Sequence, residues 1–225
     1  NGLTIAAEWQ TQGRGRRGRP WHALPGATLT FSLLWRFEQG AGFLAGLSLA
    51  VGVAVLRALN ACGVRDAGLK WPNDVLWSGR KLAGILIEMQ GDMLGPSAAV
   101  IGIGLNCRLP AALLGRIDQP VVDVATAGGA ASDRNRLLAL LLIELDRMLT
   151  SFAHEGFAAT RDEWQRCHVH QGKPVKLALP DGGTVNGRAE GVADNGALLL
   201  ATRSGRLPFH SGEVSLRAGD EKRDC

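Results

Sequence analysis

The run from residue 40 to residue 56 carries no charged side chain, and this limits what the chain can fold into. Such a run is buried either in a bilayer or in a protein core. A membrane-spanning helix needs roughly 20 predominantly apolar residues, and this run is short and diluted by glycine. We therefore expect a core helix over Gly42–Cys62, packed closely through its small residues and stopped by Gly63.

Short apolar segments on both sides of this helix have the length and composition of strands. They cover residues 3–9, 27–35, 69–71, 75–77, 82–88 and 98–106. An apolar period of 3.6 residues predicts a helix over Arg134–Leu149, with Ser132 or Asp133 as its cap. A further helix is expected over 157–167. Strands and helices in this order indicate an α+β fold.

Glycine and proline become frequent after residue 171, where the pattern of the chain changes. Short apolar runs between residues 172 and 217 are separated by Asp-Gly-Gly and Asp-Asn-Gly turns. That spacing is typical of a small β-barrel of about five strands. We therefore divide the chain into an α+β domain over 1–171, a small β domain over 172–218 and a polar tail over 219–225.

The motif GRGRRGR at residues 13–19, between Trp9 and Trp21, accounts for the whole formal charge of +4. Glycine frees the backbone and leaves its N–H groups bare, and arginine carries planar charged forks that match phosphate and carboxylate. The motif predicts a mobile loop that closes over an anion. Segments rich in arginine and glycine also bind nucleic acid without sequence preference, so that alternative stays open.

The motif KWPND places Lys70, Asn73 and Asp74 around a proline that fixes an extended backbone. Asparagine and aspartate after proline are ordinary turn formers, which is the simpler interpretation. The same three side chains at the end of a strand also suit a nucleotide and its magnesium ion, since that cation prefers oxygen ligands.

Two apolar strands have polar residues at their ends that could belong to a functional site. In GRKLAGILIE we expect Lys81 to point from the edge of the core towards a site, with Gly84 allowing close approach of a backbone. In GIGLN, Asn106 ends the strand, while Gly102 and Gly104 remove side chains from one face. Something flat could lie on that face, or a helix could pack tightly against it.

Cysteine and histidine give weaker signals. The four cysteines are far apart and form no CxxC pair, which favours a reduced, cytoplasmic protein over a disulfide scaffold. The HVH sequence at 168–170 has no third ligand of matching spacing, so we expect no metal site there. The sequence contains no GxSxG, Walker or properly placed GxGxxG motif.

Taken in order, GRGRRGRPW, KWPND, GRKLAGILIE and IGIGLN, followed by a small β domain, closely resemble the biotin protein ligases over essentially the whole chain. The resemblance implies a mixed sheet flanked by helices, like that of class II synthetases and lipoate ligases, followed by an SH3-like barrel. It also implies a ligase that uses ATP and Mg²⁺ to form biotinyl-5′-AMP. The biotin then passes to a lysine of a biotin carboxyl carrier protein domain.

The resemblance also assigns roles to individual residues. Contacts with biotin or its adenylate are implied for Gln10, Arg14, Gly15, Arg16, Trp21, Lys81 and Gly84. Of these, Lys81 is expected to neutralise the carboxylate and α-phosphoryl oxygens, and Arg16 to retain the adenylate. The nucleotide and magnesium are expected near Asn73 and Asp74, and with less support near Asn106.

Two departures from the family pattern affect these expectations. Members carry a Ser-Thr-Asn stretch upstream of the first strand, and nothing before Asn1 supplies it, so we expect part of the biotin pocket to be absent. The chain also has no room for the winged-helix DNA-binding domain of some members, and we expect no sequence-specific DNA binding and no membrane partner. A homodimer is compatible with the resemblance. A lipoate or octanoyl ligase is the nearest alternative.

Overall fold

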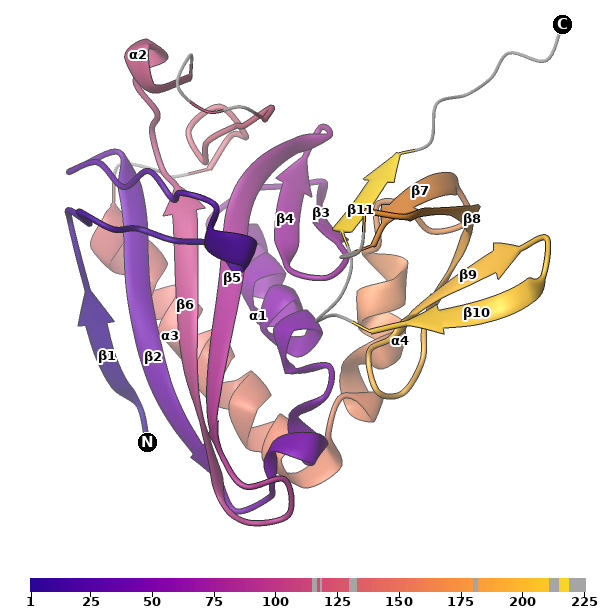
Figure 1. Cartoon of the computed structure of the whole chain (residues 1–225). Coiled ribbons are helices and arrows are strands. Elements are labelled where there is room, and N and C mark those ends of the chain that lie inside the picture. Colours follow the sequence, from indigo (N-terminus) through magenta and orange to yellow (C-terminus); the bar gives the residue numbers. More distant parts are fainter. Residues whose placement is uncertain (115–116, 118, 130–132, 180–181, 211–214, 219–225) are drawn as a thin grey trace, which may run out of the picture.

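Over the residues that it describes, the computed structural model contains two sheets with antiparallel strand pairing and four α-helices (Figure 1). It describes residues 1–114, 117, 119–129, 133–179, 182–210 and 215–218. The larger sheet is covered by helices on one face, and the smaller sheet lies beside it at the far end of the last helix. The strands of the larger sheet come from residues 3–106, and those of the smaller sheet from residues 174–218.

The larger sheet has six strands in the order β1-β2-β6-β5-β4-β3. Their bounds are Leu3–Ala6 (β1), Thr28–Phe37 (β2), Ala67–Lys70 (β3), Asp74–Trp77 (β4), Arg80–Gly91 (β5) and Ser97–Asn106 (β6). The strand pairings are antiparallel, and isolated parallel bridges join Leu69 to His168 and Lys81 to Val121. Among the described residues, the parallel pairings of this sheet are these two bridges.

Helix α1 (Leu47–Ala61) is the expected core helix, and most of its residues are buried. It begins five residues later than expected because Gly46 has a φ of +84°, which an α-helix cannot contain. A 3-10 turn, Ala41–Leu44, occupies the preceding residues. No helix in the described part of the chain has the length and apolar character needed to cross a membrane.

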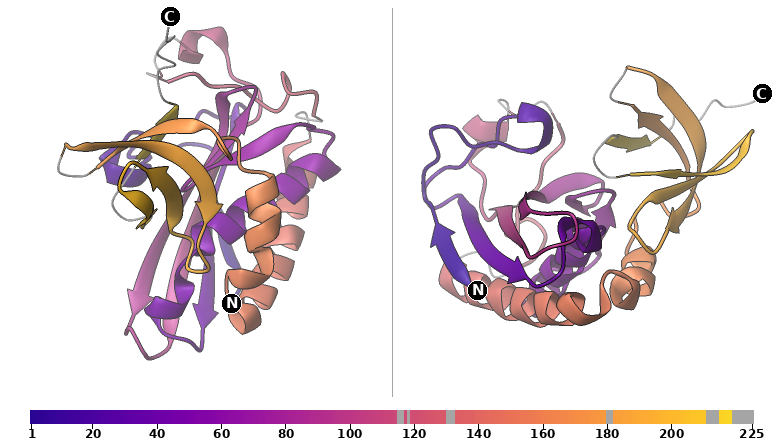
Figure 2. Two further views of the ribbon diagram at one scale, coloured as in Figure 1. Left: turned by 90° about the vertical axis from the view of Figure 1, so that its right-hand side faces the viewer. Right: turned by 60° about the horizontal axis from the view of Figure 1, so that its bottom comes forward.

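Helix α3 (Arg134–Glu155) confirms the predicted cap and the predicted apolar stripe. The Asp133 carboxylate accepts a hydrogen bond from the Arg136 amide at 2.8 Å, while Ser132 lies outside the described residues. Leu141 and Leu145 are fully buried. Helix α3 runs along the larger sheet, and α4 (Ala158–Arg166) follows it towards the smaller sheet (Figure 2). A short helix, α2 (Ala111–Leu114), lies apart from these three.

The smaller sheet has five strands in the order β10-β9-β8-β7-β11, as the turn spacing predicts. Their bounds are Pro174–Ala178 (β7), Thr184–Val192 (β8), Leu198–Thr202 (β9), Gly205–Phe209 (β10) and Ser215–Ala218 (β11). The boundary between 171 and 172 stays a prediction, and the tail over 219–225 lies outside the described residues.

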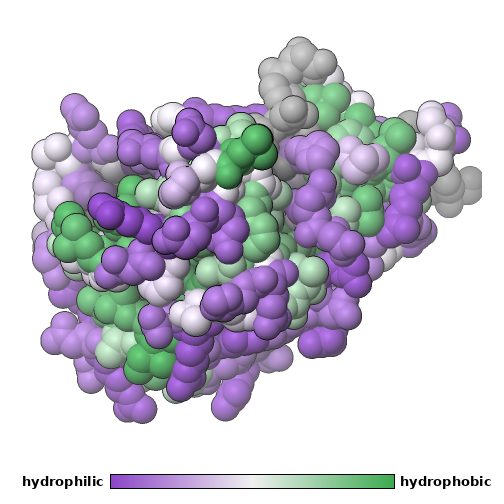
Figure 3. All heavy atoms as spheres, turned by 90° about the horizontal axis from the view of Figure 1, so that it is seen from below, coloured by the Kyte–Doolittle hydropathy of each residue, from purple (hydrophilic) through white to green (hydrophobic). Residues whose placement is uncertain are grey.

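Exposed apolar side chains occur in several parts of the described chain. Met93 and Leu94 lie in the connection between β5 and β6, at the lower end of the sheet, and both are largely exposed. Seen from below, the apolar residues form separate groups between polar side chains (Figure 3).

Candidate functional site

A cavity of about 1220 Å³ lies between the larger sheet and the loop that carries the arginine motif. Its floor is the sheet face opposite α1 and α3, and the loop crosses in front of β6 and β5 (Figure 1). Ligand pockets for small molecules commonly have volumes of about 300–1,000 Å³. The cavity is therefore large enough for a ligand of nucleotide size.

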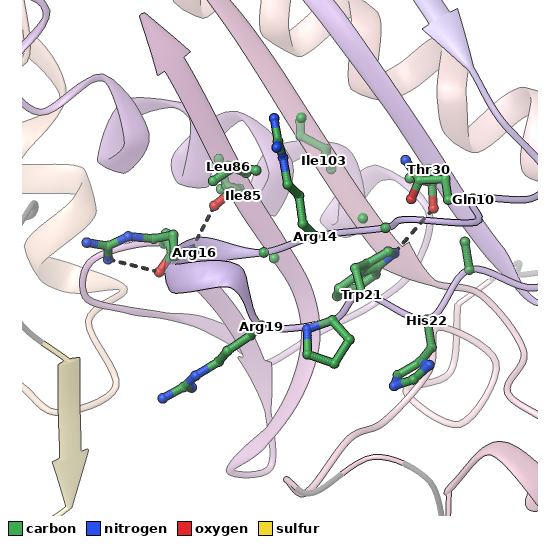
Figure 4. Close-up of a pocket in the computed structure, with 18 of the residues that line it drawn as sticks. Gln10, Arg14, Arg16, Arg19, Trp21, His22, Thr30, Ile85, Leu86 and Ile103 are labelled. Carbon is green, nitrogen blue, oxygen red and sulfur yellow. Dashed lines mark hydrogen bonds between the residues drawn. The ribbon is translucent and has the colours of Figure 1, made fainter.

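The floor is built from rows of small residues that lie side by side on neighbouring strands. Thr30 of β2 pairs with Gly104 of β6, which pairs in turn with Gly84 of β5. A Cβ atom at Gly104 would overlap the indole of Trp21, so this indole lies against the glycine. Its Nε1–H donates to Thr30 Oγ1 at 3.4 Å (Figure 4). The flat group expected on the glycine face is thus a side chain of the protein itself.

The arginine loop forms a hairpin. The Trp21 amide donates to the Gly13 carbonyl at 2.8 Å, and the Gly15 amide donates to the Arg19 carbonyl at 2.7 Å. A 3-10 turn, Arg16–Gly18, closes its tip. The expectation that glycine leaves bare N–H groups is therefore wrong at Gly15, because the hairpin brings a carbonyl opposite that amide.

The arginines of this hairpin have different surroundings. Arg14 forms an exposed ion pair with Glu88 at 2.8 Å. The Arg16 side chain is more buried, and its Nη1 donates to Asn73 Oδ1 at 3.5 Å. Burial, followed by the nearby charge of Arg17, lowers the pKa of Arg16 from its ordinary value, while Asp74 opposes this shift. Arg19 extends away from the Trp21 side (Figure 4).

Lys81 reaches the cavity from the beginning of β5, as expected. Its Nζ lies 2.7 Å from Asp74 Oδ1, and both side chains are 16% exposed. The same Nζ lies 6.0 Å from the centre of the Trp21 ring. A Cβ atom at Gly84 would lie only 3.2 Å from Nζ, so the glycine leaves room for the ammonium group. One carboxylate therefore holds this ammonium group at the cavity wall.

The two asparagines have different positions. Asn73 lines the cavity, and its Nδ2 donates to the Ile85 carbonyl at 2.7 Å. Asn106 is buried below the lining, where its Nδ2 donates to the carbonyls of Val122 at 3.0 Å and Lys81 at 3.3 Å. Asn106 can therefore position the backbone that carries Lys81, and its expected place at the nucleotide stays a prediction.

The structure brings most of the sequence-predicted residues to one cavity. Its lining includes Gln10, Arg14, Gly15, Arg16, Trp21, Asn73, Asp74, Lys81 and Gly84. Sequence reasoning missed Ser32 on β2 and Glu88 on β5, which line the cavity too. Alternation along a strand could have found Glu88, because Gly84, Leu86 and Glu88 share one face.

The charge of the lining favours an anionic ligand. Six cationic side chains face two carboxylates there, those of Asp74 and Glu88. A magnesium ion fits this donor set only in part, because no three His, Cys, Asp or Glu side chains group together among the described residues. Mg²⁺ commonly takes one or two carboxylates and completes its shell with phosphate and water. The Asp74 carboxylate and the Asn73 amide oxygen suit such a site.

Comparison with known families and relatives gives consistent matches. Residues 1–106 match the model of the biotin/lipoate A/B protein ligase family, and residues 170–217 match the biotin protein ligase C-terminal domain. The bifunctional ligase/repressor BirA of Escherichia coli is 37% identical over 98% of this chain and 68% of its own. The biotin–[acetyl-CoA-carboxylase] ligase of Paracoccus denitrificans is 36% identical over 93% of this chain and 88% of its own.

A solved structure has the same fold. The biotin protein ligase of Aquifex aeolicus in complex with biotin and ATP superimposes with a TM-score of 0.81 at 30% identity. The match covers 96% of this chain and 89% of that one.

Proposed function

Because the chain belongs to the biotin protein ligase family, we propose that its cavity joins biotin to ATP and passes the biotin to a lysine of an acceptor protein. The observation that carries the proposal is the position of Lys81, whose Nζ is held 2.7 Å from Asp74 in the wall of the cavity. The arginine hairpin lines the same cavity. Cationic side chains from the hairpin and from Lys81 suit a reaction that brings together two anions, the biotin carboxylate and ATP.

In the first step, an oxygen of the biotin carboxylate attacks the α-phosphorus of ATP, and the bond to the pyrophosphate oxygen breaks. Negative charge develops on the α-phosphoryl oxygens, and a fixed cation lowers the barrier by stabilising it. We assign this role to Lys81, with Asp74 orienting its ammonium group. Mg²⁺ bound to the phosphates would neutralise further charge, with Asp74 and Asn73 as its protein ligands.

In the second step, the amine of the acceptor lysine attacks the acyl carbon of biotinyl-5′-AMP. The bond from this carbon to the phosphate oxygen breaks, AMP leaves, and the amine loses a proton. Water would hydrolyse the same mixed anhydride, so the enzyme must cover it between the steps. We assign this cover to the hairpin, with Arg14 and Gly15 near biotin and the phosphate, Arg16 retaining the adenylate and Trp21 packing beside it.

The proposal also covers the acceptor protein, the cellular compartment and the oligomeric state. We propose a carboxylase carrier domain as the acceptor, in agreement with the names of the relatives. The buried free thiols of Cys62 and Cys107 suit the reducing cytoplasm. A homodimer is also proposed, because β1 is an edge strand with exposed Leu3 and Ile5. Light scattering tests the dimer.

Biotin-dependent exchange of labelled pyrophosphate into ATP tests the first step on the whole chain. Lipoate or octanoate in place of biotin tests the nearest alternative. Exchange that occurs with biotin and not with lipoate or octanoate supports the proposal. Exchange that occurs only with lipoate or octanoate contradicts it.

Arg16→Gly tests the retaining hairpin. We expect the variant to release the adenylate about tenfold faster than the native chain, so that lysines of a bystander protein become biotinylated. Arg19→Gly is the comparison on the same hairpin: Arg19 also lines the cavity, but it extends away from Trp21, so we expect it to retain the adenylate better than Arg16→Gly does. Mass spectrometry of the bystander gives the result, and an unlabelled bystander with Arg16→Gly would remove this role from Arg16.

A further inference from the structure

A hydrogen bond in the interior connects the smaller sheet to the segment that carries Asn73 and Asp74. The Trp71 indole is fully buried, and its Nε1–H donates to the Gly196 carbonyl at 3.0 Å. Gly196 lies in the turn between β8 and β9, so the bond spans 125 residues of sequence. Trp71 itself does not line the cavity, but it lies two residues before Asn73.

The turn that accepts this bond is held in place by other contacts. Within the turn, the Gly196 amide donates to the Ala193 carbonyl at 2.9 Å. A Cβ atom at Gly196 would lie 2.7 Å from Gly46 Cα, so the turn packs directly against the backbone at the start of α1. Arg161 of α4 forms an ion pair with Asp194 of the same turn. The Gly196 carbonyl is therefore a fixed acceptor.

Each of the three residues that lead from Trp71 to the cavity, Pro72, Asn73 and Asp74, is held by a hydrogen bond or an ion pair. The Pro72 carbonyl accepts a hydrogen bond from Ser48 Oγ at 3.1 Å. The Asn73 carbonyl accepts one from the Ile85 amide at 3.0 Å, and the next side chain, Asp74, holds Lys81. The Trp71 indole is the one link in this series that reaches the smaller sheet.

We propose that the turn Ala193–Ala197 is a positioning element of the ligation site, and that the Trp71 indole is the group through which it sets Asn73 and Asp74. This inference rests on the proposed function, because it assigns those two residues to the nucleotide and its magnesium. A side chain that is displaced by about 1 Å can cost a large factor in binding or rate. The smaller sheet then contributes to ATP binding without lining the cavity.

Trp71→Phe tests the bond, since it keeps an aromatic ring in the buried space and removes the donor. Gly196→Ala tests the same link from the other side, because it keeps the indole and pushes the turn away from Gly46. Trp77→Phe is the matched control: its Nε1–H also donates to a backbone carbonyl, that of Arg65 at 2.8 Å, and Trp77 does not line the cavity.

Titration calorimetry with a non-hydrolysable ATP analogue and saturating biotin gives the primary result, with thermal unfolding as the measure of folding. We expect Trp71→Phe and Gly196→Ala to bind the analogue about tenfold more weakly and to raise the KM for ATP by a similar factor. The KM for biotin should change less, and Trp77→Phe should match the native chain.

A folded Trp71→Phe with native affinity for the analogue would overturn the inference, because the bond would then be merely structural. If Trp71→Phe does not fold, Gly196→Ala decides by the same measurement. The proposed function has its own test: a native chain without biotin-dependent pyrophosphate exchange would refute that function, whereas native exchange together with unaffected variants would refute the positioning role alone.

Discussion

The two faces of the larger sheet carry different kinds of side chain on the same strands. On the helix face, Phe31, Ile103 and Ile85 form a row across β2, β6 and β5, and all three are buried under α1 and α3. On the cavity face, the neighbouring row is Thr30, Gly104 and Gly84. Because successive side chains of a strand point to opposite sides, a single segment supplies both the core and the floor of the site.

Titratable groups follow the same division. On the cavity side, Lys81 and Asp74 form an ion pair. On the packed side, His168 is 5% exposed, and its ring lies 4.6 Å from that of Trp164 on α4. Burial, with the neighbouring His170, lowers the pKa of His168 to about 4, so this ring is neutral at neutral pH. A charge is thus retained where a ligand can use it and is removed where packing excludes water.

Replacing the cation of the cavity face should have the largest effect. We expect Lys81→Ala to slow biotin-dependent pyrophosphate release by ~10²-fold or more, because the developing phosphoryl charge loses its fixed counter-charge. Single-turnover measurements with saturating ATP and biotin separate this step from later release.

The adjacent residue provides the control for this experiment. Arg80 carries the same charge, but its guanidinium lies over the Trp77 ring, 5.7 Å from the ring centre, and the side chain does not line the cavity. Arg80→Ala should leave the rate close to native. Undiminished pyrophosphate release in Lys81→Ala would remove Lys81 from its role as the fixed counter-charge of the cavity face.

Adding one methyl group to the floor should have an intermediate effect. Because a Cβ atom at Gly104 would overlap the indole, Gly104→Ala must displace Trp21 and the base of the hairpin. We expect the KM for biotin or ATP to rise about tenfold while the fold is kept, since the helix face of β6 is unchanged. Steady-state kinetics of the exchange reaction measures the change.

A double-mutant cycle separates this displacement from general damage to β6. In a chain that already carries Trp21→Ala, the space beside Gly104 is open, so Gly104→Ala should cost much less there. An equal rise in KM in both backgrounds would mean that Gly104 is needed for the strand itself and not for the position of Trp21.

Sequence patterns predicted the strands of the larger sheet and the helices α1, α3 and α4, because each depends on local spacing. The stripe of α3, the strand lengths and the lysine at the start of β5 are of this kind. Helix α2 was not predicted, and most of the site residues were implied by the resemblance to a family. The hairpin of the arginine motif was not predicted, since the hydrogen bond from Gly15 to the Arg19 carbonyl depends on the path of the whole loop. The pairing of Trp21 with Gly104 joins segments far apart in sequence and leaves no local signal.

Contacts between distant parts of the chain account for the other missed features. The late start of α1 follows from Gly46, whose Cβ would overlap Phe157 near the start of α4. The bond from Trp71 to Gly196 crosses from one sheet to the other. Asn106 ends its strand as expected, yet its amide binds the backbone of Val122, in a segment whose path the sequence pattern does not indicate.

The histidines of the packed side should give the smallest effect. Burial, then Lys70 and Lys173, lowers the pKa of His170 to about 4, as burial and His170 do for His168. In the unfolded chain these rings titrate near 6.5. Between pH 7 and pH 6 the unfolded state therefore takes up protons that the native state does not, and the free energy of unfolding falls by about 1 kcal/mol for the two rings together. The loss continues towards pH 4 and then levels off.

Thermal unfolding at pH 7 and pH 6 measures this slope, in a window where carboxylates bind few protons in either state. His168→Phe keeps an aromatic ring against Trp164 and cannot titrate, so it should lose about half of the slope. His154→Gln removes an exposed histidine from α3 and is the control. An unchanged slope in His168→Phe would mean that the ring takes up its proton over the same pH range in the folded protein as in the unfolded chain, and the packed side would then tolerate charge as the cavity side does.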